Sequence, residues 1–117
     1  MRLADPERRL TGELHIMQHY EKALALTRGM LEAAQKNEWD RLMELERERA
    51  TLVDRLRDLD RDPSPDTRER EHKRDLLREI MQSDEQIEIL TRDWMRELRE
   101  VLGSISAEQR LSRTYGT

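Results

Sequence analysis

The sequence predicts an all-α protein: an antiparallel helical bundle of three long helices followed by a short C-terminal helix. Charged residues make up 41% of the 117 residues, against about 25% in an average soluble domain. Apolar residues recur at steps of three and four along separate stretches, which is the spacing of one face of an α-helix. This pattern favours helices with narrow apolar faces and wide solvated ones. We therefore expect a single helical domain over residues 1–117.

The first helix is predicted over residues 10–36, after a charged lead-in that contains Pro6. Its apolar face is wider than a two-stranded seam requires, which indicates more than one packing neighbour. The face consists of Leu10, Leu14, Met17, Tyr20, Leu24, Thr27, Leu31 and Ala34, widened by Ile16, Ala23, Met30 and Ala33.

A second helix is predicted over residues 38–60, with Asn37 as its N-cap candidate. The short connection makes the first two helices antiparallel neighbours. Pro63 and Pro65 follow the second helix. Because proline cannot continue a helix, these two residues form the firmest boundary in the chain.

The third helix is predicted over residues 67–103. It would be about 54 Å long, whereas the second helix would be about 33 Å long. Part of its apolar seam must therefore pack on the first helix, on another chain or on a ligand. The seam consists of Leu76, Ile80, Ser83, Ile87, Leu90, Trp94, Leu98, Val101 and Ile105.

A short fourth helix is predicted over residues 107–115. Gly103 suits a helix C-cap, and Ser106 and Gln109 have the spacing of a capping box. The apolar residues of this helix include Leu111 and Tyr115. A helix this short is marginal unless it docks on another surface.

Sites for catalysis or for a metal are not expected. His15 and His19 have a spacing used in helical zinc sites, but no third ligand follows on that face. The carboxylates lie among arginines on faces that are predicted to be solvated, where no pKa shift for acid–base work is expected. Cysteine is absent, which removes thiolate ligands and nucleophiles. We predict no enzyme activity, no cofactor and no metal.

The charge pattern argues against direct nucleic-acid binding and membrane insertion. The net charge is −4, and acidic and basic residues are interleaved, as in the helical spacing of Glu69 with Lys73 and of Glu88 with Arg92. The first residues are charged where a secretion signal needs an apolar stretch. No window resembles the run of about 20 apolar residues that spans a bilayer. A cytoplasmic protein is expected.

Three stretches resemble the FliT-type flagellar export chaperones. Residues 31–40 contain Ala34-Gln35 and Glu38-Trp39-Asp40, which resemble the family's Ala-Gln-x-x-Glu-Trp-Asp junction. Residues 84–87 and the long seam that follows form the second stretch, and residues 109–116, ending in Tyr-Gly, form the third. The resemblance implies a small helical bundle that binds the C-terminal region of the filament cap protein and delivers it to the export ATPase and the export gate.

The resemblance also implies that the C-terminal helix is regulatory and that, in some bacteria, the free chaperone binds the flagellar master transcriptional regulator. For this chain, we predict that Leu111 and Tyr115 lie on that regulatory helix and that the chain is a monomer or homodimer. The client-binding groove is predicted between the second and third helices, lined by Met43, Leu52, Leu56, Ile80, Ile87 and Met95. The alternative is a structural, self-assembling coiled-coil protein or an interaction adaptor.

Overall fold

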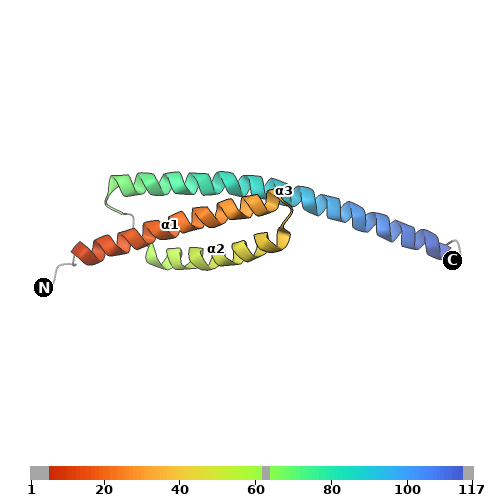
Figure 1. Cartoon of the computed structure of the whole chain (residues 1–117), viewed down its shortest axis with the longest axis horizontal. Coiled ribbons are helices and arrows are strands. Elements are labelled where there is room, and N and C mark those ends of the chain that lie inside the picture. The colour runs from red at the N-terminus through yellow and green to blue at the C-terminus, as the bar shows by residue number, and fades with distance from the viewer. Residues whose placement is uncertain (1–5, 62–63, 115–117) are drawn as a thin grey trace. The chain divides into compact units, whose positions relative to one another are not determined.

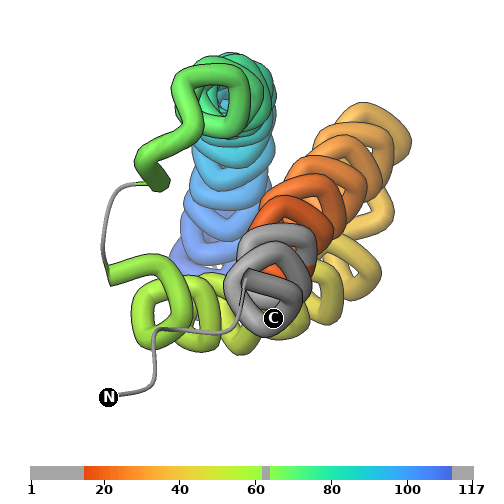
Figure 2. Tube along the Cα trace, turned by 90° about the vertical axis from the view of Figure 1, so that its left-hand side faces the viewer, coloured from red at the N-terminus to blue at the C-terminus, as the bar shows by residue number. Residues whose placement is uncertain are grey.

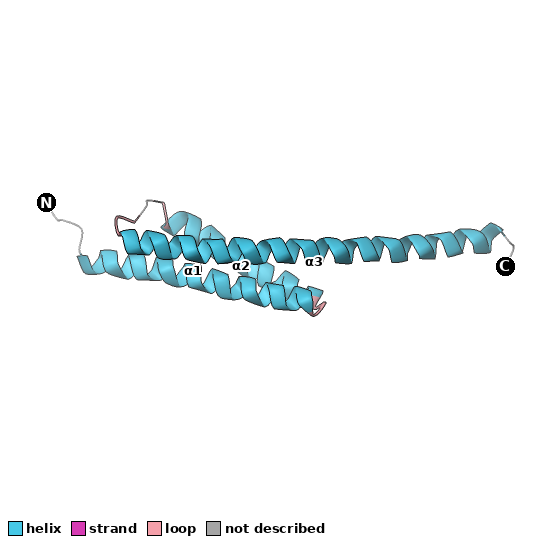
Figure 3. Ribbon diagram, turned by 90° about the horizontal axis from the view of Figure 1, so that it is seen from above, coloured by secondary structure: helices cyan, strands magenta, loops and turns pink. Residues whose placement is uncertain are grey.

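The computed structural model describes residues 6–61 and 64–114, with side chains over residues 15–61 and 64–111. All regular structure in these ranges is helical (Figure 3). The three helices are α1 (Pro6–Gln35), α2 (Trp39–Leu59) and α3 (Thr67–Thr114). The predicted all-α class with three long helices is confirmed.

The predicted short fourth helix is not a separate element, because α3 continues unbroken to Thr114. Gly103 and Ser106 lie inside α3 and do not act as caps. A glycine inside a helix costs only about 1 kcal/mol relative to alanine. The neighbouring residues, such as Leu102 and Ala107, are good helix formers. One glycine is therefore not enough to end this helix.

The junction between α1 and α2 corrects the predicted role of Asn37. Its φ angle is 59°, in the left-handed region that asparagine tolerates. The Glu38 amide donates to the Ala33 carbonyl (2.8 Å) and the Asn37 amide donates to the Ala34 carbonyl (3.3 Å). This pair of bonds is the Schellman motif, which ends a helix. Asn37 thus terminates α1, and Glu38 occupies the N-cap position of α2 without a side-chain capping bond.

The start of α1 also differs from the prediction, since the helix begins at Pro6 and not near Leu10. Proline is favoured in the first helical position because the N–H that it lacks would have no partner there.

The chain divides into two compact units, Met1–Ile87 and Glu88–Thr117, and α3 contributes to both. In the first unit, α1 and α2 lie side by side and run in opposite directions (Figure 1; Figure 2). The first half of α3 pairs with α1 through Arg28 and Glu79, and with α2 through Arg49 and Asp84. The first unit is therefore an antiparallel three-helix bundle.

Two clusters of buried side chains hold this bundle together. The first joins α1, α2 and α3 near the α1–α2 junction, and the second lies closer to the N-terminus of α1. Half-buried Leu45 packs against both. The first cluster comprises Met30, Ala33, Leu42 and Ile87, and the second comprises Ala23, Leu26 and Leu52 with half-buried Ile80.

Small residues on α1 allow α2 to approach closely. A Cβ atom at Gly29 would lie 3.2 Å from Cδ1 of Leu45, which is tighter than an ordinary van der Waals contact. Ala33 is fully buried. The α1–α2 contact is thus closely packed at the backbone level, while α3 meets the pair through longer side chains.

Candidate functional site

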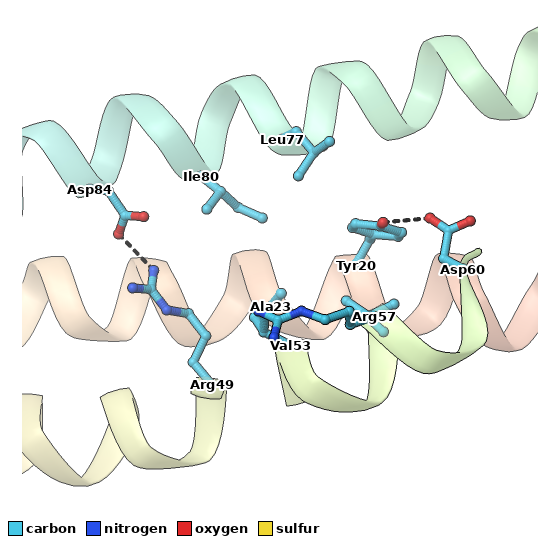
Figure 4. A pocket seen from close by; sticks show the side chains of 10 residues that line it. Tyr20, Ala23, Arg49, Val53, Arg57, Asp60, Leu77, Ile80 and Asp84 are labelled. Carbon is cyan, nitrogen blue, oxygen red and sulfur yellow. Dashed lines mark hydrogen bonds and ion pairs between the residues drawn. The ribbon is translucent and has the colours of Figure 1, made fainter. Parts of the chain in front are cut away.

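A cavity of about 450 Å³ lies between α1, α2 and the first half of α3. All the residues that line it belong to the first unit. Figure 4 shows polar side chains at its two ends, and apolar side chains together with the Arg57 side chain between them. The lining residues are Tyr20, Ala23, Arg49, Val53, Leu56, Arg57, Asp60, Leu77, Ile80 and Asp84.

One end of the cavity is closed by a cluster of three polar side chains, one from each helix or its edge. The Tyr20 hydroxyl donates a 2.6 Å hydrogen bond to Oδ2 of Asp60. The ammonium group of Lys73 donates to the same oxygen and lies 5.2 Å from the centre of the Tyr20 ring. A cation over an aromatic face is attracted by the ring's negative potential. The cluster therefore joins α1, the end of α2 and α3.

The pKa shifts in this cluster favour a charged Asp60 carboxylate paired with a charged Lys73 ammonium group. Burial alone raises the pKa of Asp60, but hydrogen bonds from Lys73 and Tyr20 outweigh burial and hold the pKa below its ordinary value. Burial alone lowers the pKa of Lys73, but the bond to Asp60 and the nearby charges leave that pKa raised. Burial and the Asp60 carboxylate together raise the pKa of Tyr20. At neutral pH the cluster is a carboxylate, an ammonium and a neutral phenol.

The other end of the cavity is closed by Arg49 of α2. Its guanidinium donates to Oδ1 of Asp84 at 2.6 Å and to Oγ1 of Thr27 at 3.0 Å. The Thr27 hydroxyl in turn donates to the Ala23 carbonyl at 2.8 Å. Thr27 is fully buried, so these bonds satisfy a hydroxyl that would otherwise be costly to bury. This network again connects all three helices.

Apolar residues form the middle of the cavity. Ala23 of α1 is buried, and Ile80 of α3 is half-buried. Val53 on α2 and Leu77 on α3 are 39% and 37% exposed. An open apolar surface between two polar ends is suited to receive apolar side chains from another molecule.

The structure places the predicted groove residues in three kinds of environment. Leu56 and Ile80 line the cavity. Leu52 and Ile87 are buried in the core clusters. Met43 is exposed on α2 and Met95 on α3, away from the lining of the cavity. Client contact at these six residues stays a prediction.

The second unit offers a different surface, the apolar stripe of α3. We define this stripe as Leu98, Val101 and Ile105, which are 37%, 56% and 45% exposed. Leu111, predicted to be regulatory, is 56% exposed and lies on the same continuous helix. Tyr115 lies outside the described residues. The described part of the second unit, residues 88–114, is one helical segment, so the stripe has no second helix within that part to pack against.

Comparison with known proteins agrees with the resemblance found in the sequence. The family model described as "Flagellar protein FliT" matches residues 17–117. The chain belongs to the FliT family. Its relatives include proteins named "Flagellar protein FliT" from the YPIII, PB1/+ and IP32953 strains of Yersinia pseudotuberculosis. Each is 28% identical over 102 residues, which cover 87% of this chain and 85% of the relative. No solved structure matches the chain.

Membership of the FliT family confirms the predicted resemblance and supports the flagellar chaperone class. In this FliT-family chain, the polar ends of the cavity are not predictable from the sequence pattern. That pattern places Tyr20 only on an apolar face, and it pairs Lys73 with Glu69 by spacing. In the structure Lys73 bonds to Asp60, while Glu69 accepts a 2.7 Å bond from Ser64. The predicted Glu88–Arg92 pair is present at 3.5 Å.

The described part of this FliT-family chain contains no group of three or more His, Cys, Asp or Glu side chains that is placed to hold a metal ion. Nδ1 of His19 lies 2.6 Å from the His15 carbonyl oxygen, so that ring contacts its own helix backbone. Among the described residues, no helix is both long and apolar enough to cross a membrane.

Proposed function

We propose that this chain is a flagellar export chaperone that holds the C-terminal region of the filament cap protein before secretion. The chaperone then presents this client to the export ATPase and the export gate. It works in the cytoplasm, as a monomer or homodimer, without enzyme activity, a cofactor, direct nucleic-acid binding or membrane insertion. Family membership supports the flagellar role. The client assignment comes from the family resemblance.

One structural observation carries the chaperone proposal: the apolar seam of α3 continues beyond the residues that are buried. Leu76 and Ile87 are each 8% exposed, whereas Val101 and Ile105, further along the same seam, are about half exposed. Burial of apolar surface contributes about 25 cal/mol per Å². The binding of an amphipathic client helix over the stripe is therefore favourable, and the apolar face of the bound helix is kept from aggregating.

The cavity of the first unit is a separate candidate surface for client binding. Leu56 and Ile80 line it, together with the more exposed Val53 and Leu77. Leu52 packs in the core cluster that shares Ala23 and Ile80 with this surface, and Ile87 packs in the other core cluster. Taken by itself, the cavity suits single anchor side chains of a client, and the stripe, taken by itself, suits the apolar face of an amphipathic helix.

The stripe can be tested by binding measurements with matched variants. Leu98→Glu places a carboxylate on the stripe. Ala107→Glu places a carboxylate on the opposite face of the same exposed helix. We expect Leu98→Glu to weaken binding of the purified cap-protein C-terminal region about tenfold or more, the scale of a contact hot spot, and Ala107→Glu to bind as the wild type does. Equal affinity of both variants would exclude the stripe as the client site. Ile87 is unsuitable for such a test, because it is buried and its substitution would report on folding.

A regulatory role of the C-terminal segment is part of the proposal. Leu111 is exposed in the structure, so it is available for a partner. A pull-down from the native cytoplasm with the full chain and with residues 104–117 removed tests this role. Recovery of the export ATPase or of the master regulator only after truncation is expected if the segment covers their binding surface; identical recovery from both would contradict it.

The seam spacing also favours a second candidate, a coiled-coil protein that assembles with copies of itself. Sedimentation separates the two functions. A chaperone remains a monomer or weak dimer that takes up one client per chain. A structural protein forms a stable oligomer and takes up none.

A further inference from the structure

The charged side chains around the cavity are paired, with one exception. Asp84 is paired with Arg49, and Asp60 is paired with Lys73. These two pairs leave no net charge at either end of the cavity. Both carboxylates at the cavity thus already have a cationic partner within the chain and are not expected to bind a cationic ligand.

Arg57 of α2 is the exception. It lines the cavity but has no hydrogen bond or ion pair with any described residue. Asp58, its neighbour in sequence, is instead paired with Arg61 at 3.9 Å. Among the described residues that line the cavity, Arg57 is therefore the one charged group without a paired counter-charge, although the chain as a whole has a net charge of −4.

The position of this charge matters because apolar surface surrounds it. Val53 and Leu77 are both more than one-third exposed, and buried Ala23 lines the same cavity. A ligand that fills this space with an apolar side chain brings its neighbouring groups close to Arg57. Water is displaced there, so an arriving carboxylate interacts with the guanidinium more strongly than it would in bulk solvent. Guanidinium groups also bind carboxylates in a bidentate manner.

We propose that the cavity selects client helices that carry a carboxylate next to the apolar side chain that enters the cavity, and that Arg57 binds this carboxylate. The occupant is the amphipathic helix of the exported client, so this inference rests on the proposed function. The cavity of about 450 Å³ lies in the lower part of the roughly 300–1,000 Å³ range of ligand pockets. It takes a few side chains of such a helix. Arg57 determines which clients bind there, and the apolar wall provides most of the affinity.

Charge reversal at Arg57 tests the proposal, with Arg55 as a matched control. Arg55 lies on the same helix about 200° away; it is exposed and has no ion pair with a described residue. The probe is the purified C-terminal region of the cap protein, titrated against the full chain. We expect Arg57→Gln to weaken binding about threefold and Arg57→Glu about tenfold or more, while Arg55→Glu retains the wild-type affinity.

A compensating exchange identifies the client's carboxylate. Each acidic residue of the client region is replaced by lysine in turn and measured against Arg57→Glu. Recovery of affinity by one such replacement is the expected result. If Arg57→Glu and Arg55→Glu weakened client binding equally, or if neither variant weakened it, the charge selection would be overturned while the chaperone function stayed intact. If the wild-type chain did not bind the client at all, the proposed function itself would fail.

Discussion

The hydroxyl group of Tyr20 donates a 2.6 Å hydrogen bond to Oδ2 of Asp60, and the two residues are 40 positions apart in the sequence. This bond connects the middle of α1 to the residue that follows α2. Lys73 of α3 donates to the same oxygen. One carboxylate thus fixes where the third helix starts along the first two.

Replacement of Lys73 by methionine should destabilise the bundle in a pH-dependent way. The variant leaves the half-buried Asp60 without its cation, which is expected to cost about 1–2 kcal/mol of unfolding free energy at pH 7. The folded-state pKa of Asp60 is lowered, so its contribution is present above the ordinary aspartate pKa and is lost as pH falls through the folded value. The difference between wild type and variant should therefore shrink in acid, as measured by urea denaturation at several pH values.

The same cluster should weaken in alkali, because the pKa values of Lys73 and Tyr20 are raised. Their contributions are complete below the unfolded pKa values and are lost as pH rises through the folded ones. Lys22→Met is the control, since Lys22 forms a 3.7 Å pair with Glu48 in which both side chains are more than half exposed. A pair of this kind contributes roughly 0–1 kcal/mol. An equal loss for both variants would contradict the importance of the cluster.

Replacement of Arg49 by methionine should loosen α3 from the first two helices. The variant removes the donors to Asp84 and Thr27 and leaves two half-buried or buried acceptors, so we expect a loss of about 1–3 kcal/mol. Arg28→Met provides the comparison, because Arg28 also joins α1 to α3 but in an exposed pair with Glu79. Urea denaturation measures both, and a loss for Arg28→Met as large as for Arg49→Met would show that burial of the network is not decisive.

Gly29 of α1 and Gly103 of α3 should respond differently to alanine. A Cβ atom at Gly103 would meet nothing within 4 Å, so Gly103→Ala should stabilise the surrounding helix by about 0.5–1 kcal/mol. At Gly29 the new Cβ atom would press on Leu45, which offsets this gain. Hydrogen exchange of the amides around residue 103 measures the first effect, and denaturation measures the second. Unchanged exchange rates in Gly103→Ala would contradict the expectation.

A single cysteine offers a direct test of cavity occupancy, because the native chain has none. Val53→Cys places a thiol on the exposed wall of the cavity, and Glu46→Cys places one on the exposed surface of α2 outside the cavity. Saturating client should slow thiol alkylation at position 53 about fivefold or more if it fills the cavity, since reactivity follows access. Alkylation at position 46 should not change. Equal rates at position 53 with and without client would show that the cavity stays open in the complex.

Several features of the chain follow from the sequence alone. The steps of three and four predict where α1, α2 and most of α3 lie, because burial of one helix face needs that spacing. Pro63 and Pro65 predict the end of α2, which stops at Leu59. The α1–α2 junction, residues 31–40, together with residues 84–87 and the tail, residues 109–116, resembles the FliT family, and the family match confirms that resemblance.

Other features were decided by the tertiary structure. Gly103 and Ser106 carry the local signals of a helix end, yet α3 passes through both. A single residue of low helix propensity costs less free energy than the interruption of a helix. Lys73 bonds to Asp60 and not to Glu69, which is closer in sequence.

The same holds for the cavity and its charges. The pairs Arg49–Asp84 and Tyr20–Asp60 join residues 35 and 40 positions apart, and local periodicity says nothing about how one helix is shifted along another. Arg57 resembles every other arginine of α2 until its neighbours' partners are known. The sequence by itself determined which faces are apolar; only the packing of three helices determined which charges were left without a partner, because pairing depends on distances across helices that no local pattern encodes.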